Sequence, residues 1–358
     1  MKRSLFLTIG IALMAVIFVF TATPAMTKKV LLKVPVCFPT ALPGLGTTAP
    51  WLADRIETLS NGQIKMKVYE PSKLVAPFEI LDAVSTGKIN AGFSMAAYWQ
   101  GKIPAAALFS SVPFGPEAGE YLAWLYHGDG LKLYQEMYDR SGYNVKVLVF
   151  GIIAPETSGW FSKPIEKVED LKGLRMRFFG LGGEVMQKLG VSTSLLPGGE
   201  IFPALEKGAL DATEYSMPAI DQRLGLYKIV HYNYYPGWHQ QATVSELLIN
   251  KDVWNAMTDH QKMVLEVGTR AATLDSFALT EAIQAPVIKE NVTKRGVKNM
   301  YWNDEMLNAF KSAWKEVVAE QSKDEFFKKV YDNMEAFRED YKYWSEWGFL
   351  PRPGKGGK

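Results

Sequence analysis

The chain has 358 residues, with 40 Lys and Arg against 38 Asp and Glu, 47% hydrophobic residues and 22% charged residues. These proportions are those of an ordinary globular protein, and they exclude a disordered, collagen-like or polytopic membrane protein. Two domains are expected at this length, because one hydrophobic core seldom serves so long a chain. The single cysteine, Cys37, cannot form a disulfide within the chain, so the fold depends on ordinary burial.

The first residues predict export. Lys2 and Arg3 precede an apolar run over residues 5–20, and small residues at positions 23 and 25 suit a cleavage after Ala25. We therefore predict a signal peptide over residues 1–25 and a mature protein in the periplasm. Its removal takes away two positive charges and leaves 38 of each sign, which gives no electrostatic case for nucleic-acid binding. An uncleaved N-terminal anchor on the same soluble body is the alternative.

Short apolar runs alternate with helical patterns from residue 29 onward, which predicts an α/β protein. The expected strands cover residues 30–34, 64–68, 89–93 and 145–150. The expected helices cover residues 51–60, 78–85 and 116–138, the last of them broken near residues 128–130. The C-terminal third is mostly helical, and we predict that the tail 349–358 is disordered.

Two stretches roughly 120 residues apart repeat one helix-to-strand pattern. In each, a helix ends at a glycine, Gly87 or Gly208, and an apolar residue, Asn or Asp, and Ala follow. Glycine suits the left-handed position that closes a helix. Two copies imply two lobes of similar build. The residues after each copy, 94–99 and 214–215, should then face a shared cleft, because ligands lie beyond the carboxyl ends of strands in open α/β sheets. A chance match of a common capping pattern is the alternative.

Two enzyme signatures are incomplete. Residues 92–96 resemble a nucleophile elbow, but Ala96 replaces the last glycine and no partner histidine is identifiable. Residues 180–183 resemble the start of a dinucleotide fingerprint, but Val185 stands where its third glycine is required. We interpret this segment as a tight turn whose following helix N-terminus could help to hold an anion. No spacing of histidine or cysteine indicates a zinc or haem site.

Arg175 and Arg177 alternate along a short predicted strand, so they are expected on one face of it. Met176, Phe178 and Phe179 give this strand an apolar flank. Arginine offers a planar, two-pronged donor that matches a carboxylate, which lysine cannot do. The pattern therefore indicates a site for a small anion, and a surface ion pair is the alternative.

One face of the last predicted helix is apolar, with steps of four and three residues. Its members are Val330, Met334, Phe337, Tyr341 and Trp344. The stripe is short for a coiled coil, so packing on the chain's own domain is favoured and a homodimer through the C-terminal helices is the alternative.

Five segments together carry a family resemblance. They are DAVSTG (82–87), GWF (159–161), LKGLRMR (171–177), PALEKGALDA (203–212) and YPGW (235–238). Their combination resembles the DctP-type solute-binding receptors of tripartite ATP-independent periplasmic (TRAP) transporters, over a stretch from about Val30 to Trp347. Within that family, the chain is most similar to the branch that binds 2-oxo and 2-hydroxy monocarboxylates with a metal ion.

The resemblance implies a two-lobed periplasmic-binding-protein clamshell with a long helix spanning both lobes, and no catalysis. Lobe I would comprise residues 26–150 with part of 243–290. Lobe II would comprise residues 151–242 with part of 290–348. The captured solute would be delivered to a sodium-driven TRAP membrane permease.

The resemblance also implies residues that touch the solute and the metal. Arg177 matches the carboxylate-binding arginine of the family, and Tyr98 and Trp99 fall in the first-lobe segment that touches the solute. Glu214 matches an acidic metal ligand, and Tyr215 matches an aromatic residue whose backbone carbonyl commonly coordinates the metal.

Two positions depart from the branch. Glu156 stands where the branch usually has glutamine, and Gln240 stands where it usually has glutamate, so both would contribute to the solute and metal site with the carboxylate count unchanged. Two carboxylates and a carboxylate ligand at roughly 4 Å would repel by several kcal/mol at an effective dielectric constant near 20, unless a cation lay between them. All-oxygen ligation indicates calcium or sodium, and the charge favours calcium. Solvent exposure of the two glutamates, or their pairing with Arg175, is the alternative.

The leading hypothesis is an extracytoplasmic receptor for a small organic acid, a 2-oxo or 2-hydroxy monocarboxylate. An exported lyase or hydrolase that uses Glu156 and Glu214 as acid and base is the alternative from another class. A sensory receptor that presents the closed lobes to a membrane kinase is a third reading.

Overall fold

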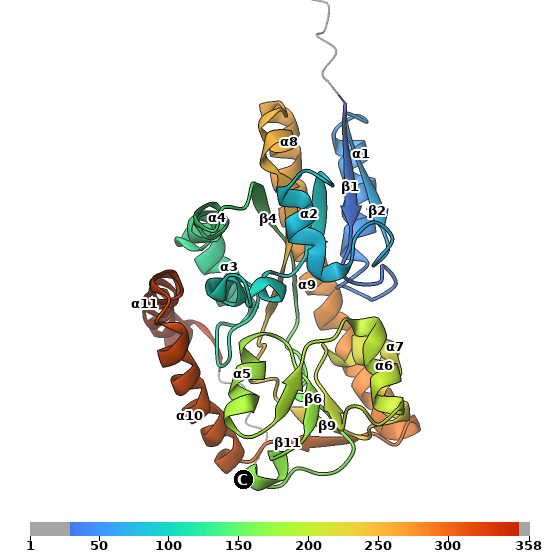
Figure 1. Ribbon diagram of the computed structural model, residues 1–358, viewed down its shortest axis with the longest axis vertical. Coiled ribbons are helices and arrows are strands. Elements are labelled where there is room, and N and C mark those ends of the chain that lie inside the picture. The colour runs from blue at the N-terminus through green and yellow to red at the C-terminus, as the bar shows by residue number, and fades with distance from the viewer. Residues whose placement is uncertain (1–28, 351–358) are drawn as a thin grey trace, which may run out of the picture.

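The computed structural model describes residues 29–350, which form two lobes (Figure 1). The segments at residues 154–158 and 236–242, which link strands of one lobe to strands of the other, are called the crossing segments. The predicted signal peptide and residues 351–358 of the predicted tail lie outside the described residues. Among the described residues, no helix combines the length and the apolar character that crossing a bilayer would demand.

Lobe I is built on two small sheets that a bridge between Val36 and Phe93 connects. In the first, β1 (Val30–Pro35) and β2 (Ile64–Tyr69) run parallel. The second has the order β3-β10-β4, all antiparallel. Its strands are β3 (Ala91–Ser94), β10 (Thr243–Asn250) and β4 (Val145–Ile153).

Helices cover the sheets of lobe I. They are α1 (Thr48–Leu59), α2 (Ile80–Ser85), α3 (Ala118–His127), α4 (Gly130–Arg140) and α8 (Lys251–Asn255), with the 3₁₀ helices η1 (Pro77–Glu79), η2 (Ala96–Trp99) and η3 (Pro104–Phe109). The predicted break near residues 128–130 is confirmed, since it separates α3 from α4.

Lobe II holds one mixed sheet of six strands in the order β11-β9-β5-β8-β6-β7. The strands are β5 (Gly159–Phe161), β6 (Arg175–Arg177), β7 (Ser192–Ser194), β8 (Ala212–Thr213), β9 (Tyr232–Tyr235) and β11 (Lys298–Tyr301). The helices of lobe II are η4 (Val168–Leu171), α5 (Gly180–Lys188), α6 (Gly198–Glu206), α7 (Pro218–Leu224) and η5 (Leu226–Lys228).

The two copies of the helix-to-strand pattern are confirmed as equivalent units. Gly87 and Gly208 both adopt the left-handed conformation, with φ of 75° and 67°. Each glycine follows the end of a helix, α2 or α6, and precedes a buried strand, β3 or β8. A residue with a Cβ would be strained at this position, which explains why glycine recurs there.

The long helix α9 (Asp259–Lys294) spans both lobes, as Figure 1 shows. It packs against α1 and β4 in lobe I and against α7 in lobe II. Two of its hydroxyl groups hold the end of β4 and the segment that leaves it. Ser276 Oγ accepts a hydrogen bond from Ile152 N at 3.1 Å, and Thr280 Oγ1 accepts one from Ala154 N at 3.0 Å.

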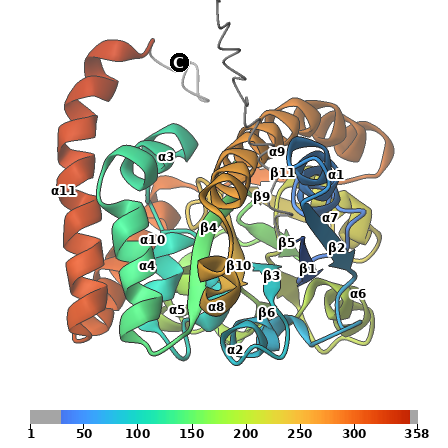
Figure 2. The same ribbon diagram turned by 90° about the horizontal axis from the view of Figure 1, so that it is seen from above.

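The C-terminal helices divide between the lobes. Helix α10 (Asp304–Gln321) packs on α5 of lobe II, whereas α11 (Glu325–Gly348) packs on η3, α3 and α4 of lobe I, as Figure 2 shows. Val330 and Met334 are fully buried, which fits the favoured prediction that the stripe packs on its own chain. Trp344, at the far end of the stripe, is 57% exposed.

Candidate functional site

A small enclosed cavity lies between the lobes. Its volume is about 10 Å³, room for about one water molecule. It is lined by Phe38, Leu45, Met95 and Tyr98 of lobe I, by Arg177, Phe179, Tyr215 and Ser216 of lobe II, and by Glu156 and Gln240 of the crossing segments. Side chains from distant stretches of the chain therefore converge where the lobes meet.

Arg177 ends strand β6 and is 1% exposed. Its Nη1 donates to the Glu214 carboxylate at 2.8 Å and to the Glu214 backbone carbonyl at 2.6 Å, and its Nε donates to the Leu196 carbonyl at 3.3 Å. Among the described residues, none accepts a hydrogen bond from Nη2. The guanidinium is therefore held in place, while one of its two terminal nitrogens stays open to an anion.

Three oxygen atoms beside this arginine are buried and have no hydrogen-bond partner among the described residues. They are Glu156 Oε2, Glu214 Oε1 and Gln240 Oε1. The other carboxylate oxygen of Glu156 accepts from the hydroxyl group of Thr243 at 3.2 Å and from that of Ser216 at 3.4 Å. A buried oxygen without a partner costs about 1–3 kcal/mol, so three of them together call for an explanation.

Oxygen atoms of this kind fit a hard cation, which takes carboxylate and amide oxygens as ligands. Ligand atoms of Glu156, Glu214 and His239 also lie within 4.8 Å of one another. The residues present therefore suit a metal ion such as calcium or sodium.

The two glutamates differ in their pKa. Burial, reinforced by the negative charge of Glu214, raises the pKa of Glu156 well above its usual value. Burial also acts to raise the pKa of Glu214, but the positive charge of Arg177, together with the nearby His239 and Glu156, brings this pKa below the usual value. Each carboxylate charge therefore opposes the other, and a cation between them would favour ionisation of both.

The crossing segments that carry Glu156 and Gln240 lie against each other. The backbone N–H of Glu156 donates to the carbonyl of Gln240 at 3.1 Å. Gly237 permits this approach, since a Cβ there would lie 2.2 Å from the Glu156 carbonyl oxygen. Glu156 and Gln240, the two residues at which this chain differs from the metal-binding branch, therefore lie next to each other in one site.

His239 was not foreseen from the sequence. It is 1% exposed, its Nε2 lies 3.6 Å from Glu214 Oε1, and its ring contacts Phe178 and Trp238. The only signal for it was its place next to Gln240. The apolar lining residues Phe38, Leu45 and Met95 were also missed, because they come from segments with no distinctive motif.

Tyr98 and Trp99, both expected to touch the solute, point in different directions. Tyr98 lines the cavity, and its ring lies 5.2 Å from that of Phe179 in the other lobe. Trp99 does not line the cavity: its indole N–H donates to Glu246 at 2.8 Å inside lobe I. Successive residues of a 3₁₀ helix point about 120° apart, so neighbours in η2 cannot both face the cleft.

Arg175 lies at the outer end of strand β6 and is half exposed, with 52% of its side chain accessible. It binds the Asp211 carboxylate through two nitrogens, at 2.9 and 2.7 Å. It therefore pairs with neither Glu156 nor Glu214. The alternative in which Arg175 neutralises these glutamates was wrong, because Asp211 occupies its guanidinium.

A family model described as bacterial extracellular solute-binding protein, family 7, or DctP, matches residues 44–324. The chain belongs to this family. A curated relative, the monocarboxylate 2-oxoacid-binding periplasmic protein of Nostoc sp. strain PCC 7120, is 36% identical over 298 residues, which is 83% of this chain and 81% of the relative. Membership makes the chain an extracytoplasmic solute receptor, and the relatives give no support to the alternative of a lyase or hydrolase.

Solved structures of TRAP solute-binding proteins share the two-lobed fold of this family 7 receptor. The protein from Pseudoalteromonas atlantica, with bound sodium and pyruvate, is 30% identical with a TM-score of 0.85, covering 90% of this chain and 97% of its own. The protein from Colwellia psychrerythraea, with bound calcium and pyruvate, is 29% identical with a TM-score of 0.85, covering 90% and 98%. The protein from Bordetella bronchiseptica, a dimer with calcium and picolinate, is 28% identical with a TM-score of 0.87, covering 90% and 95%.

Proposed function

We propose that this receptor binds a small 2-oxo or 2-hydroxy monocarboxylate together with a calcium ion and delivers it, in the periplasm, to a TRAP membrane permease. One observation carries the proposal: Arg177, with Nη2 open, lies beside three buried oxygen atoms of Glu156, Glu214 and Gln240 that have no partner among the described residues. A guanidinium and a cation side by side offer two positive centres to one carboxylate.

The division of roles follows from the contacts. Arg177 grips one carboxylate oxygen of the ligand. The metal, held by Glu156, Glu214, Gln240 and the backbone carbonyl of Tyr215, takes the other carboxylate oxygen and the adjacent oxo or hydroxy oxygen. Chelation by adjacent oxygens distinguishes 2-oxo and 2-hydroxy acids from simple fatty acids, which have no second oxygen in that place.

Charge balance favours calcium over sodium. The positive charge of Arg177 is already opposed by Glu214 at 2.8 Å. The ligand carboxylate and an ionised Glu156 then add two negative charges inside a buried site. A divalent ion neutralises both, whereas sodium leaves one uncompensated or requires Glu156 to keep its proton.

The lining of the cavity and the relatives support a small ligand. The lobe I wall is apolar, made by Phe38, Leu45 and Met95, and Phe179 continues it in lobe II. Such a wall suits a short apolar substituent on the acid. Relatives at about 30% identity bind pyruvate, with calcium in one case and sodium in another.

Thermal unfolding measured with pyruvate and related acids, with calcium and with chelator, tests the proposed function. A ligand that binds only the folded state at 100 times its Kd adds about 2.7 kcal/mol to the free energy of unfolding. We expect pyruvate to raise the melting temperature in calcium, and a chelator to abolish that rise. A rise of the same size in chelator would reject the metal, and no response to any 2-oxo or 2-hydroxy acid would reject the ligand class.

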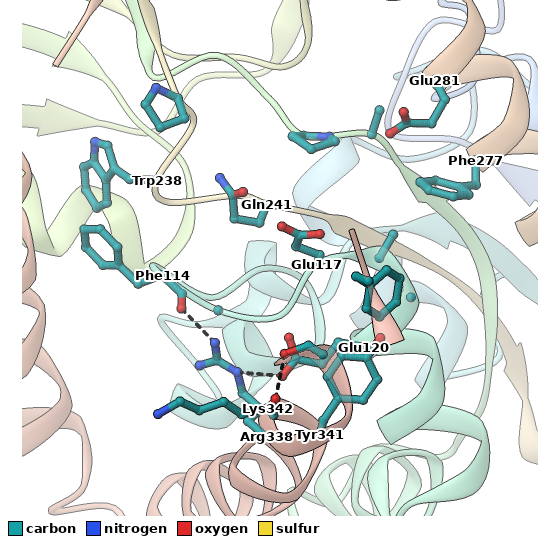
Figure 3. Close-up of a pocket in the computed structure, with 18 of the residues that line it drawn as sticks. Phe114, Glu117, Glu120, Trp238, Gln241, Phe277, Glu281, Arg338, Tyr341 and Lys342 are labelled. Atoms are coloured by element: carbon teal, nitrogen blue, oxygen red, sulfur yellow. Dashed lines mark hydrogen bonds and ion pairs between the residues drawn. The ribbon is translucent and has the colours of Figure 1, made fainter. Parts of the chain in front are cut away.

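The C-terminal helices also support the homodimer alternative. Several large apolar side chains near the end of α11 are exposed by 57–91%: Tyr343, Trp344, Trp347, Phe349 and Leu350. Beside them a groove of about 1470 Å³ lies between α9, α10 and α11. Figure 3 shows Arg338 of α11 bonded to Glu120 and to the Phe114 carbonyl on one side of this groove, with Phe277 of α9 opposite.

We propose that a second copy of the chain covers this apolar end of α11, because monomeric proteins rarely expose so many large apolar side chains together. Sedimentation of the protein should then show a dimer. Replacement of Trp344 and Trp347 by Ser should shift it to a monomer, whereas Leu59→Ser, at a position 56% exposed on lobe I, should not. A wild-type protein that sediments as a monomer at micromolar concentration would refute the dimer.

A further inference from the structure

We propose that Gln100 and Glu184 form a latch between the lobes, which stabilises the closed receptor and so raises its affinity for a ligand that neither residue touches. The inference rests on the proposed function, because it concerns the affinity of that same site. It also assigns a role to the glycine-rich segment at residues 180–183, which matched no complete nucleotide-binding motif.

The latch is a direct side-chain contact between the lobes. Gln100 follows η2 of lobe I, and Glu184 lies in α5 of lobe II, 84 residues further along the chain. Gln100 Nε2 donates to Glu184 Oε1 at 3.1 Å. The other oxygen, Glu184 Oε2, accepts from Gln321 Nε2 of α10 at 2.8 Å. The bond from Gln321 therefore fixes the Glu184 carboxylate within lobe II, where it can accept a hydrogen bond from the Gln100 amide of lobe I.

Small residues of the two lobes face each other beside the latch. Gly180, at the start of α5, has φ of 64°, and a Cβ there would lie 3.7 Å from Ser111 Oγ and 3.8 Å from Ala97 Cβ. Both neighbours belong to lobe I. Helix α5 and η2 are in contact. The predicted tight turn is in fact the first turn of this helix.

Neither Gln100 nor Glu184 lines the cavity between the lobes. Their hydrogen bond exists only when the lobes are closed, so its free energy favours the closed conformation. In the closed conformation, Arg177 of lobe II and Tyr98 of lobe I face the same cavity. A contact that favours the binding-competent conformation raises the measured affinity without contacting the ligand.

Isothermal calorimetry with pyruvate in saturating calcium tests the latch. We expect Gln100→Ala and Glu184→Ala each to weaken binding about tenfold, since a hydrogen bond to a carboxylate is worth roughly that much. The double variant should be no weaker than either single variant, because both remove the same bond. Glu184→Gln should retain most of the affinity, since its amide oxygen can still accept from Gln100.

Lys188→Ala is the matched control. Lys188 also lies on α5, but it pairs with Glu320 of α10 within lobe II, so its loss should leave affinity unchanged.

Wild-type affinity in both Gln100→Ala and Glu184→Ala, or additive losses in the double variant, would overturn the latch. If the wild-type protein binds no acid, the proposed function fails, and small-angle X-ray scattering then tests whether the latch holds the lobes closed. Glu184→Ala should then have a larger radius of gyration than wild type, and coincident scattering curves would overturn the inference.

Discussion

Replacing Arg177 by Lys is expected to weaken binding of pyruvate by about 100-fold, which corresponds to about 2.7 kcal/mol. The guanidinium is fixed by Glu214 and by the Leu196 carbonyl, and it still has Nη2 for the ligand. A lysine ammonium is a point charge that cannot satisfy these acceptors and a ligand carboxylate in the same geometry. Isothermal calorimetry in saturating calcium measures the change.

The lysine variant is preferable to Arg177→Ala for this measurement. Alanine would leave the Glu214 carboxylate buried without its positive partner, at a cost of about 3–5 kcal/mol to folding. Arg175→Lys is the matched control on the same strand, because Arg175 pairs with Asp211 at the surface. Unchanged binding of every 2-oxo acid by Arg177→Lys would reject the role of Arg177.

Replacing Glu156 by Gln is expected to weaken calcium binding by about tenfold or more. This change removes one of the two carboxylates that face the cation, and the affinity of an oxygen site for calcium depends on its charge count. Adding Gln240→Glu to the same chain restores the number of carboxylates to two, with the second one at position 240 instead of position 156. The double variant Glu156→Gln, Gln240→Glu should therefore recover most of the calcium affinity, measured by titration of the metal in the presence of pyruvate.

The control for this pair is Glu246→Gln. Glu246 is also fully buried, but it lies inside lobe I, where it accepts hydrogen bonds from Trp99, Tyr134 and Tyr138. Its loss should leave calcium affinity unchanged. Equal calcium affinity in wild type, Glu156→Gln and the double variant would show that these positions do not hold the metal.

The polar and apolar parts of the site come from different parts of the molecule. Lobe II supplies Arg177 and Glu214, and the crossing segments supply Glu156 and Gln240. Lobe I supplies an apolar wall and the ring of Tyr98, which meets Phe179 across the cleft. The charged contacts therefore need no lobe closure to assemble, whereas exclusion of water from them does.

Local patterns were enough to predict much of the fold. Apolar periodicity predicted the strands at 30–34, 64–68, 89–93 and 145–150 and the helices at 51–60, 78–85 and 116–138. The two glycines, Gly87 and Gly208, marked equivalent units because only glycine adopts their left-handed backbone without strain. The family resemblance then supplied the residues of the site. The structure brings Arg177, Glu214 and Glu156 together, and their role in ligand binding stays a prediction for the experiments above.

Contacts between distant segments could not be predicted from local sequence patterns. Trp99 and Tyr98 are adjacent in sequence and equally aromatic, yet one supports lobe I and the other faces the cleft, because their directions depend on how η2 packs. The bond between Gln100 and Glu184 joins two residues with no local signature. Periodicity and capping report the conformation of the backbone nearby, whereas the partner of a buried polar side chain is chosen by the packing of whole lobes.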